Sequence, residues 1–157
     1  MKLGLVAVGR MKAGPLPTLF QDYARRLAWP LLVVEVEERR PLPAAELKER
    51  EGALILDALA NSFRKAWSPA PVALDQRGAA LDSRAFAERL ARWRDAGADP
   101  VFVIGGADGL SPGVLERMDA TLSLGPMTWP HQLVRVLLAE QLFRAQSILA
   151  GHPYHRD

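Results

Sequence analysis

The sequence predicts an α/β fold in which a mainly parallel sheet carries helices on both faces. Segments with strand and helix patterns alternate along the whole chain, as they do in proteins with parallel sheets. Two strand candidates, Leu3–Val8 and Val101–Ile104, consist of apolar and small residues throughout, which is typical of strands covered by helices on both sides. The 157 residues contain no repeat or linker, so we expect one domain over residues 1–157.

The first half of the chain supplies three strands and two helices. Apolar residues at helical spacing predict the first helix, which Trp29–Pro30 ends. The third strand is predicted to be short, because a polar turn, Gln76–Gly78, follows it at once. The predicted elements are the strands Leu3–Val8, Leu31–Val36 and Val72–Leu74 and the helices Pro15–Leu27 and Ala44–Ala60.

The second half repeats the alternation with clearer start and stop signals. Asp82 is a plausible N-cap, and Gly97 marks the end of the helix that follows. Ser111–Pro112 is typical of a helix start. The predicted elements are the helix Ser83–Asp95, the strand Val101–Ile104, a short helix after Ser111, the strand Ala120–Leu124 and the helix His131–Leu149.

Composition narrows the class of protein. Hydrophobic residues make up 49% of the chain and the net charge is +2, which is ordinary for a globular protein and too low for a general polyanion binder. The chain has no cysteine, which excludes disulfides, thiolate catalysis and Cys-ligated zinc. We find no metal-ligand pattern, no membrane-spanning run and no signal-peptide core, so we expect no metal, no membrane association and a cytoplasmic location.

Two strand ends followed by glycine-bearing turns are the strongest functional signal. Gly105 and Gly106 follow one strand and Gly125 follows the next, where α/β proteins bind ligands. The first turn lacks the spacing of a dinucleotide fingerprint or a P-loop, and a simple tight turn is the alternative. The second could bind a flat heterocycle through its backbone, although core packing explains its side chains equally well. It contains Gly125, Pro126, Met127, Thr128, Trp129 and Pro130.

Histidines and a tyrosine add further candidates. His131, at the start of the last helix, could accept a proton, but a capping role is the stronger interpretation. The C-terminal tail is expected to be a frayed surface segment unless it contacts RNA, for which stacking rings beside an arginine are suited. The tail candidates are His152, Tyr154, His155 and Arg156.

The helix His131–Leu149 is apolar over too wide an arc for one buried face. In a chain of this size, the second apolar side could face another subunit. We therefore predict a homodimer that uses this helix.

Several motifs together resemble the RlmH family, which are bacterial 23S ribosomal RNA methyltransferases of the SPOUT class. The resemblance covers essentially the whole chain in order, and its proline-histidine and tail motifs are specific. The motifs are VAVG (Val6–Gly9), LD (Leu74–Asp75), IGG-x-x-GLS (Ile104–Ser111), PHQLVRVLLAEQLFRA from Pro130, and HPYHR (His152–Arg156).

The resemblance implies a homodimeric enzyme with a C-terminal trefoil knot that uses S-adenosylmethionine to methylate N3 of a pseudouridine in the helix 69 hairpin of 23S rRNA. In this reading the knot loops bind the cofactor through Leu74, Gly105, Gly106, Gly125, Pro126, Met127, Thr128, Trp129 and Pro130. The N-terminal loop with Arg10 and Lys12, and the partner's tail with His152, Tyr154, His155 and Arg156, would bind RNA.

For catalysis, Asp108, Tyr154 and His155 are candidate bases or orienters, and Arg156 could stabilise the charge on the pyrimidine ring. Ala107–Asp108 stands where family members often have Pro-Glu, and the side chain of Asp108 reaches less far than that of a glutamate. The residues between Gly9 and Leu16 also differ from the family. A flavodoxin-like nucleotide-binding enzyme and a non-catalytic ribosome-binding module remain the alternatives.

Overall fold

The computed structural model describes residues 1–155, and five strands form one sheet in the order β2-β1-β4-β3-β5. All four neighbouring strand pairs are parallel, with Val6 opposite both Val34 and Val103. The expected parallel sheet is therefore confirmed. The strands are β1 Leu3–Val8, β2 Leu31–Val36, β3 Pro69–Ala80, β4 Asp99–Ile104 and β5 Ala120–Ser123.

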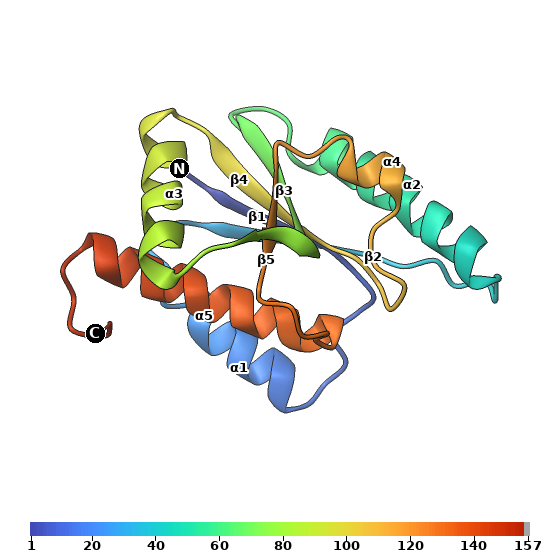
Figure 1. Cartoon of the computed structure of the whole chain (residues 1–157), viewed down its shortest axis with the longest axis horizontal. Coiled ribbons are helices and arrows are strands. Elements are labelled where there is room, and N and C mark those ends of the chain that lie inside the picture. Colours follow the sequence, from blue (N-terminus) through green and yellow to red (C-terminus); the bar gives the residue numbers. More distant parts are fainter. Residues whose placement is uncertain (156–157) are drawn as a thin grey trace.

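Helices cover both faces of the sheet, as predicted (Figure 1). On one face α5 lies between α1 and α3 and contacts both. On the other face α2 contacts α4. The helices are α1 Pro15–Ala24, α2 Ala44–Ser62, α3 Ser83–Asp95, α4 Pro112–Leu115 and α5 His131–Leu149.

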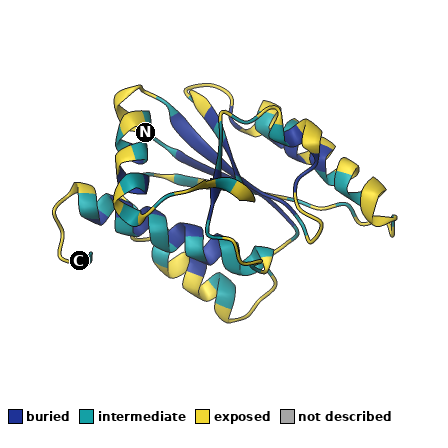
Figure 2. Cartoon of the chain, in the orientation of Figure 1, coloured by how far each residue is buried: buried dark blue, intermediate teal, exposed yellow. Residues whose placement is uncertain are grey.

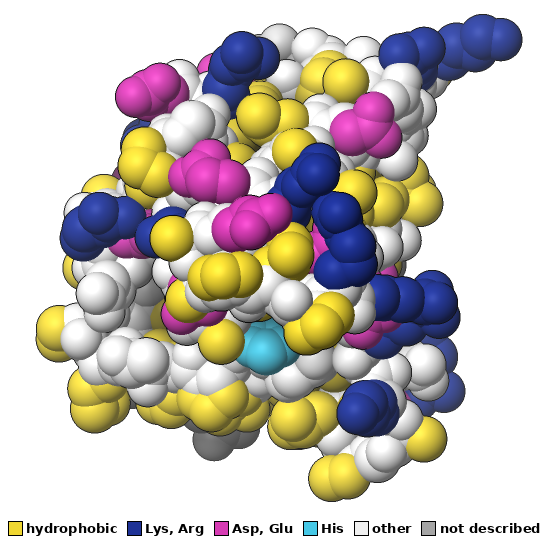
Figure 3. All heavy atoms as spheres, turned by 90° about the vertical axis from the view of Figure 1, so that its right-hand side faces the viewer, with side chains coloured by type: hydrophobic (Ala, Val, Ile, Leu, Met, Phe, Trp, Pro, Cys, Tyr) yellow, Lys and Arg dark blue, Asp and Glu magenta, His cyan; other side chains and the backbone are white. Residues whose placement is uncertain are grey.

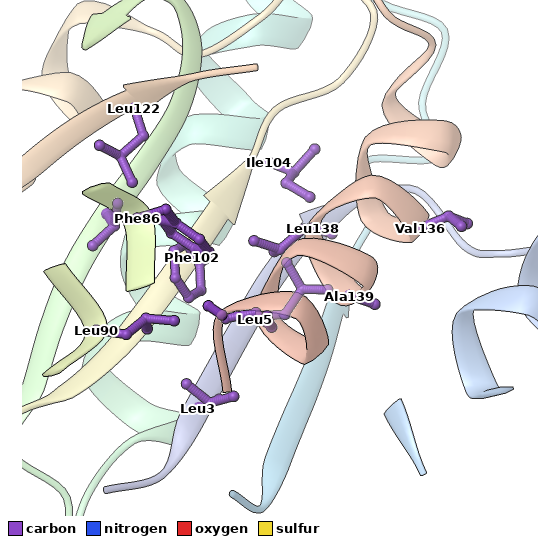
Figure 4. Packing of buried hydrophobic residues seen from close by; sticks show 14 of the residues in the cluster. Leu3, Leu5, Phe86, Leu90, Phe102, Ile104, Leu122, Val136, Leu138 and Ala139 are labelled. Carbon is purple, nitrogen blue, oxygen red and sulfur yellow. The ribbon is translucent and has the colours of Figure 1, made fainter. Parts of the chain in front are cut away.

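The core consists of two clusters of buried apolar residues, one on each face of the sheet. Figure 2 shows the central strands as buried. Because side chains alternate along a strand, Leu3 and Leu5 of β1 join the layer under α1, α3 and α5, while Val6 joins the layer under α2 and α4. In β4, Phe102 joins the layer under α1, α3 and α5, and Val103 joins the layer under α2 and α4. Figure 4 shows the larger layer, in which side chains of β1, β4, α3 and α5 meet. The central strands are thus buried on both faces, as the apolar runs indicate.

The third strand is longer than predicted and contains the segment expected to be a turn. β3 continues through Gln76–Gly78 because a register shift between Leu74 and Ala79 restores its pairing with β5. A Cβ on Gly78 would lie 2.6 Å from the backbone carbon of Leu122, so only glycine allows this approach. The polar segment is therefore a bulge that bends the strand over its neighbour.

Helix ends agree with the capping signals in part. Asp82 caps α3, accepting a hydrogen bond from Ala85 N at 2.8 Å, and Gly97 ends it with φ +68°. The first helix ends at Ala24 rather than at Leu27, because tight turn bonds, such as that from Leu27 N to Ala24 O, replace the helical pattern. These differences leave the order of elements unchanged.

The strand order excludes a flavodoxin-like fold, whose order is 2-1-3-4-5. In this chain β4 lies beside β1, and β3 lies between β4 and β5. Ligand binding at the carboxyl ends of the strands remains compatible with either order. The trefoil knot implied by the resemblance stays a prediction.

Candidate active site

The two glycine-bearing turns meet at one cavity of 460 Å³ at the carboxyl ends of β3, β4 and β5. The first turns of α5 close its other side through His131 and Val134. The structure therefore brings together loops that are about twenty residues apart in the chain. Seven of the nine cofactor candidates line the cavity, namely Leu74, Gly105, Gly106, Gly125, Met127, Thr128 and Trp129. Pro126 and Pro130 are exposed and lie outside the lining.

The glycines of the first turn pack closely against other parts of the chain. A Cβ on Gly105 would lie 2.7 Å from the backbone carbon of Gly109, with which the loop closes on itself. A Cβ on Gly106 would lie 2.7 Å from Oε2 of Glu51. The alternative of a tight turn therefore explains Gly105, where the backbone of Gly109 excludes a side chain, while at Gly106 the nearest atom is the flexible end of Glu51. The turn is consequently rigid, which suits a preformed pocket.

The second turn holds a left-handed glycine and a buried indole. Gly125 has φ +107°, and Ser123 Oγ lies 3.1 Å from its N and 3.0 Å from its O. Among the described residues, no group accepts a hydrogen bond from the buried Nε1 of Trp129. A buried donor without an acceptor is unfavourable, so the indole could accommodate an acceptor on a bound molecule.

His131 is the first residue of α5 and not its cap. Pro130 occupies the N-cap position, and within residues 1–155 no side-chain cap is found for this helix. Burial lowers the pKa of His131, and the nearby Arg135 charge lowers it further. The imidazole is therefore neutral at pH 7, at the wall of the cavity.

Two charged residues that line the cavity, Asp75 and Arg77, were not among the sequence candidates as site residues. The Arg77 guanidinium donates to both carboxylate oxygens of Asp75 at 2.9 and 3.1 Å, and this bonding lowers the pKa of Asp75. Burial raises the pKa of Glu51, and the carboxylate of Asp108 raises it further. Asp108 itself is exposed on the turn and lines the cavity. The LD motif was the sequence signal that pointed to Asp75, and Asp108 was itself a candidate.

The tail lies at the far end of α5 and is attached to the protein. Tyr154 Oη donates to Glu140 Oε1 at 3.1 Å and lies 3.4 Å from Tyr23 Oη, and its ring packs edge-on against Phe143. Burial raises the pKa of Tyr154, and the contacts with Tyr23 and Glu140 raise it further. The tail is thus anchored through Tyr154 rather than frayed.

The other tail candidates are less constrained or fall outside the structure. His155 Nδ1 lies 3.5 Å from Arg144 Nη1, and Arg144 also pairs with Glu140. His152 is exposed, and its Nδ1 accepts a hydrogen bond from the amide of Tyr154 at 3.2 Å. Arg156 lies outside the described residues.

The N-terminal loop lies beside the cavity because α5 holds it there. Gln132 donates from Nε2 to Arg10 O at 3.1 Å, while the side chains of Arg10 and Lys12 are exposed. Figure 3 views the face at the carboxyl ends of the strands and shows Lys and Arg side chains gathered along one side of it. This face therefore combines a cavity with a cationic margin.

A second cavity of 520 Å³ adjoins the first and lies between β3, β5, α3 and α5. Four residues line both cavities, namely Leu74, Leu124, Gly125 and Trp129. The shared residues separate a polar space, which contains Asp108 and Arg77, from a more apolar one, which contains Phe86.

A metal centre and a membrane span are both missing from residues 1–155. Within this range no three or more His, Cys, Asp or Glu side chains are grouped as metal ligands. Nor is any helix of this range both long enough and apolar enough to cross a bilayer.

The fold and the cavity define an α/β protein with a parallel sheet and a cavity at the carboxyl ends of its strands. The family model described as predicted SPOUT methyltransferase matches residues 1–155. The large-subunit ribosomal RNA methyltransferase H of Rhodospirillum centenum is 54% identical over 157 residues, covering 99% of each chain. The chain therefore belongs to the SPOUT methyltransferase family, and it is similar over its whole length to relatives of this kind.

Solved structures share the fold at low sequence identity. A probable methylase family protein from Haemophilus influenzae has a TM-score of 0.58 and 12% identity, covering 99% of this chain and 70% of that one. The SpoU methyltransferase AviRb from Streptomyces viridochromogenes, in complex with AdoMet, has a TM-score of 0.51 and 14% identity, covering 92% of this chain and 58% of that one. These likenesses concern the fold alone.

Proposed function

We propose that this chain uses S-adenosylmethionine to methylate N3 of a pseudouridine in the helix 69 hairpin of 23S rRNA. The observation that carries this proposal is the full-length match to a large-subunit ribosomal RNA methyltransferase at 54% identity. The choice of nucleotide and hairpin rests on the family resemblance. The cavity supports the proposal because it lies where this fold class binds small molecules.

The cavity residues fit S-adenosylmethionine. A volume of 460 Å³ falls within the range of about 300–1,000 Å³ for small-molecule sites. The unpartnered Trp129 N–H offers a buried donor, and the stiff turn at Gly125 offers backbone groups to a flat heterocycle. Leu74 and Trp129 provide apolar walls, and Gly105 and Gly106 provide close backbone. When bound, this cofactor supplies an electrophilic methyl group that requires no metal.

The protein's own work is to place N3 of the pseudouridine and to remove its proton. Orientation of two reactants can supply a large share of the acceleration. Arg10 and Lys12 would hold the RNA backbone at the margin of the cavity. Arg156 would interact with the negative charge on the pyrimidine ring as the N3 proton leaves.

Among the candidate bases, His155 is favoured over Tyr154. Tyr154 uses its hydroxyl proton to bond Glu140, and its raised pKa keeps it protonated at neutral pH. It would therefore orient the tail and the pyrimidine ring. Asp108 could instead orient the N3 proton from the cavity rim, within the reach of its short side chain.

We further propose a homodimer in which the tail of one copy completes the cavity of the other. Within one chain, Tyr154 is held at Glu140, nine residues or about 13 Å along α5 from His131 at the cavity. The tail of the same chain is therefore held away from its own cavity. Intrachain packing against α1 and α3 explains part of the wide apolar arc of α5. The partly exposed Leu133 and Leu137 remain for a partner helix.

The substrate would be an assembled ribosomal particle in the cytoplasm. A net charge of +2 is small for tight binding to naked RNA. This small net charge is more consistent with recognition of an assembled ribosomal surface, in which the shapes of protein and RNA both contribute.

Labelled S-adenosylmethionine with separate 30S, 50S and 70S particles tests the function. We expect transfer to 50S or 70S particles by the wild-type protein, none by Gly105→Ala, and normal transfer by Gly113→Ala as the matched control. Ribosome binding without transfer would contradict the proposal and favour a non-catalytic ribosome-binding module.

A further inference from the structure

Arg135 is a charged residue in the first turns of α5 that is 0% exposed. Its Nη1 lies 2.6 Å from Glu35 Oε1, and its Nη2 donates to Val8 O at 2.7 Å and to Gly9 O at 2.6 Å. Charged groups are buried at a high energetic cost unless they are paired and hydrogen-bonded. Three directed contacts to β1 and β2 therefore indicate a specific structural task.

The contacts of Arg135 converge on the start of the N-terminal loop. Val8 is the last residue of β1, and Gly9 opens the loop with φ +82°. Glu35 Oε1, which binds Arg135, also accepts a hydrogen bond from Met11 N at 2.9 Å. Arg135 and Glu35 together thus hold the loop backbone on both sides of Arg10, Arg135 through Gly9 O and Glu35 through Met11 N.

The same face of α5 holds the loop at a second point. Gln132 precedes Arg135 by three residues, so both side chains point the same way. Gln132 donates to Arg10 O, as described above. These bonds use only the backbone of the loop, and they leave the Arg10 side chain 65% exposed and close to Glu37.

The turn of α5 that binds the loop also forms the cavity wall. His131 and Val134 line the cavity, and Gln132 and Arg135 bind the loop. The helix therefore sets the position of the loop relative to the cavity. Arg135 and Gln132 thus connect the position of Arg10 to α5, whereas the turn at Gly105 and Gly106 is closed by its own bond from Gly109 N to Gly106 O.

We propose that Arg135 is a positioning residue that acts through Glu35 to place Arg10 and Lys12 for RNA docking beside the cofactor cavity. Arg135 touches neither cofactor nor RNA in this account. Its effect is on the affinity for the ribosomal particle, not on the affinity for S-adenosylmethionine. The proposal rests on the proposed function of Arg10 and Lys12.

The test compares Glu35→Gln with the wild-type protein and with Arg94→Gln, which removes an exposed ion pair with Asp95 on α3. Glu35→Gln keeps the shape of the side chain but leaves the Arg135 charge without its counter-ion. We expect a roughly tenfold higher KM for the ribosomal particle, because Arg10 loses its position, with the Kd for S-adenosylmethionine within about twofold. Arg94→Gln should leave both constants unchanged.

A double variant and an activity-independent measurement separate positioning from general damage. If Glu35 acts through Arg10, then Arg10→Gln should raise KM, and adding Glu35→Gln should raise it little further. Hydrogen exchange of the Met11 amide should accelerate in Glu35→Gln. An unchanged KM in Glu35→Gln, additive effects in the double variant, or an equal loss of cofactor affinity would each overturn the proposal. The exchange result stands even if ribosomes prove not to be the substrate.

Discussion

Glu51 occupies the space in which a side chain on Gly106 would begin, with Oε2 2.7 Å from the position of its Cβ. A side chain at this position would have to displace the flexible carboxylate of Glu51, which comes from α2 on the face of the sheet opposite to α5. The turn after β4 is itself closed by the hydrogen bond from Gly109 N to Gly106 O at 3.1 Å, a bond that requires no ligand. Preformed turns of this kind reduce the ordering that a ligand would otherwise have to cause.

Gly105→Ala should distort the cavity because its Cβ would meet the backbone of Gly109, which cannot move away cheaply. We expect a loss of about 1–3 kcal/mol in the free energy of unfolding, as for overpacked sites, and weaker cofactor binding. Thermal unfolding and calorimetric titration with S-adenosylmethionine measure both. No described atom lies within 4 Å of a Cβ on Gly113, so Gly113→Ala should match the wild-type protein. Equal stability of the two variants would contradict the packing account.

Trp129→Phe removes the buried indole N–H that has no acceptor within the described part of the chain. Because an unsatisfied buried donor costs roughly 1–3 kcal/mol, the free protein should be no less stable than the wild type. If the indole donates to the cofactor, the Kd for S-adenosylmethionine should rise by roughly tenfold, or about 1.4 kcal/mol. A variant that binds the cofactor normally would exclude this role for Trp129.

Sequence patterns predicted the elements that depend on local signals. Apolar runs predicted β1, and helical periodicity predicted α5 with its bounds. The length of β3 could not be predicted, because Gly78 serves a close approach to Leu122 on another strand. In isolation, Gln76–Gly78 has the composition of a turn.

Local patterns predicted the site only as two separate turns, and the family resemblance was needed to join them into one cofactor site. Glycines at strand ends indicated both loops, but the residues that hold them come from distant helices. Arg135 lay within a motif that carried the family resemblance, yet nothing local connects it to Glu35. Burial of its charge is a property of the packed fold, which no sequence window contains.

His131 should make stability depend on pH below neutrality. Its pKa is lowered in the native state, so as pH falls below about 6.5 the unfolded state binds a proton that the native state rejects. The free energy of unfolding should therefore decrease from pH 7 to pH 5, and less steeply in His131→Gln. Denaturant unfolding at several pH values measures this difference. Identical slopes would show that the histidine is not buried as described.

Glu51 should change the pH dependence of stability in the direction opposite to that of His131. Its raised pKa means that the native state retains a proton which the unfolded state has released, so stability falls as pH rises above about 4.5. Glu51→Gln should consequently gain stability at pH 7 relative to the wild type, and should gain little at pH 4. A loss at pH 7 would indicate that the carboxylate makes a necessary contact.

The tail can be tested by complementation between copies. One subunit would carry Gly105→Ala in its cavity and the other His155→Ala in its tail. If tails act across a homodimer, the mixed protein should regain activity, since one of its two sites has an intact cavity and an intact tail. Inactive mixed dimers, or a monomer at micromolar concentration by sedimentation, would contradict this arrangement.

The most direct test of the central claim is to locate the methyl group by mass spectrometry of nuclease fragments from 23S rRNA. Ribosomes with an unmethylated helix 69 are incubated with the protein and S-adenosylmethionine. The account predicts one methyl group per 23S rRNA, on N3 of a pseudouridine in the helix 69 hairpin. A methyl group at any other nucleotide, or none in ribosomes that bind the protein, would contradict it.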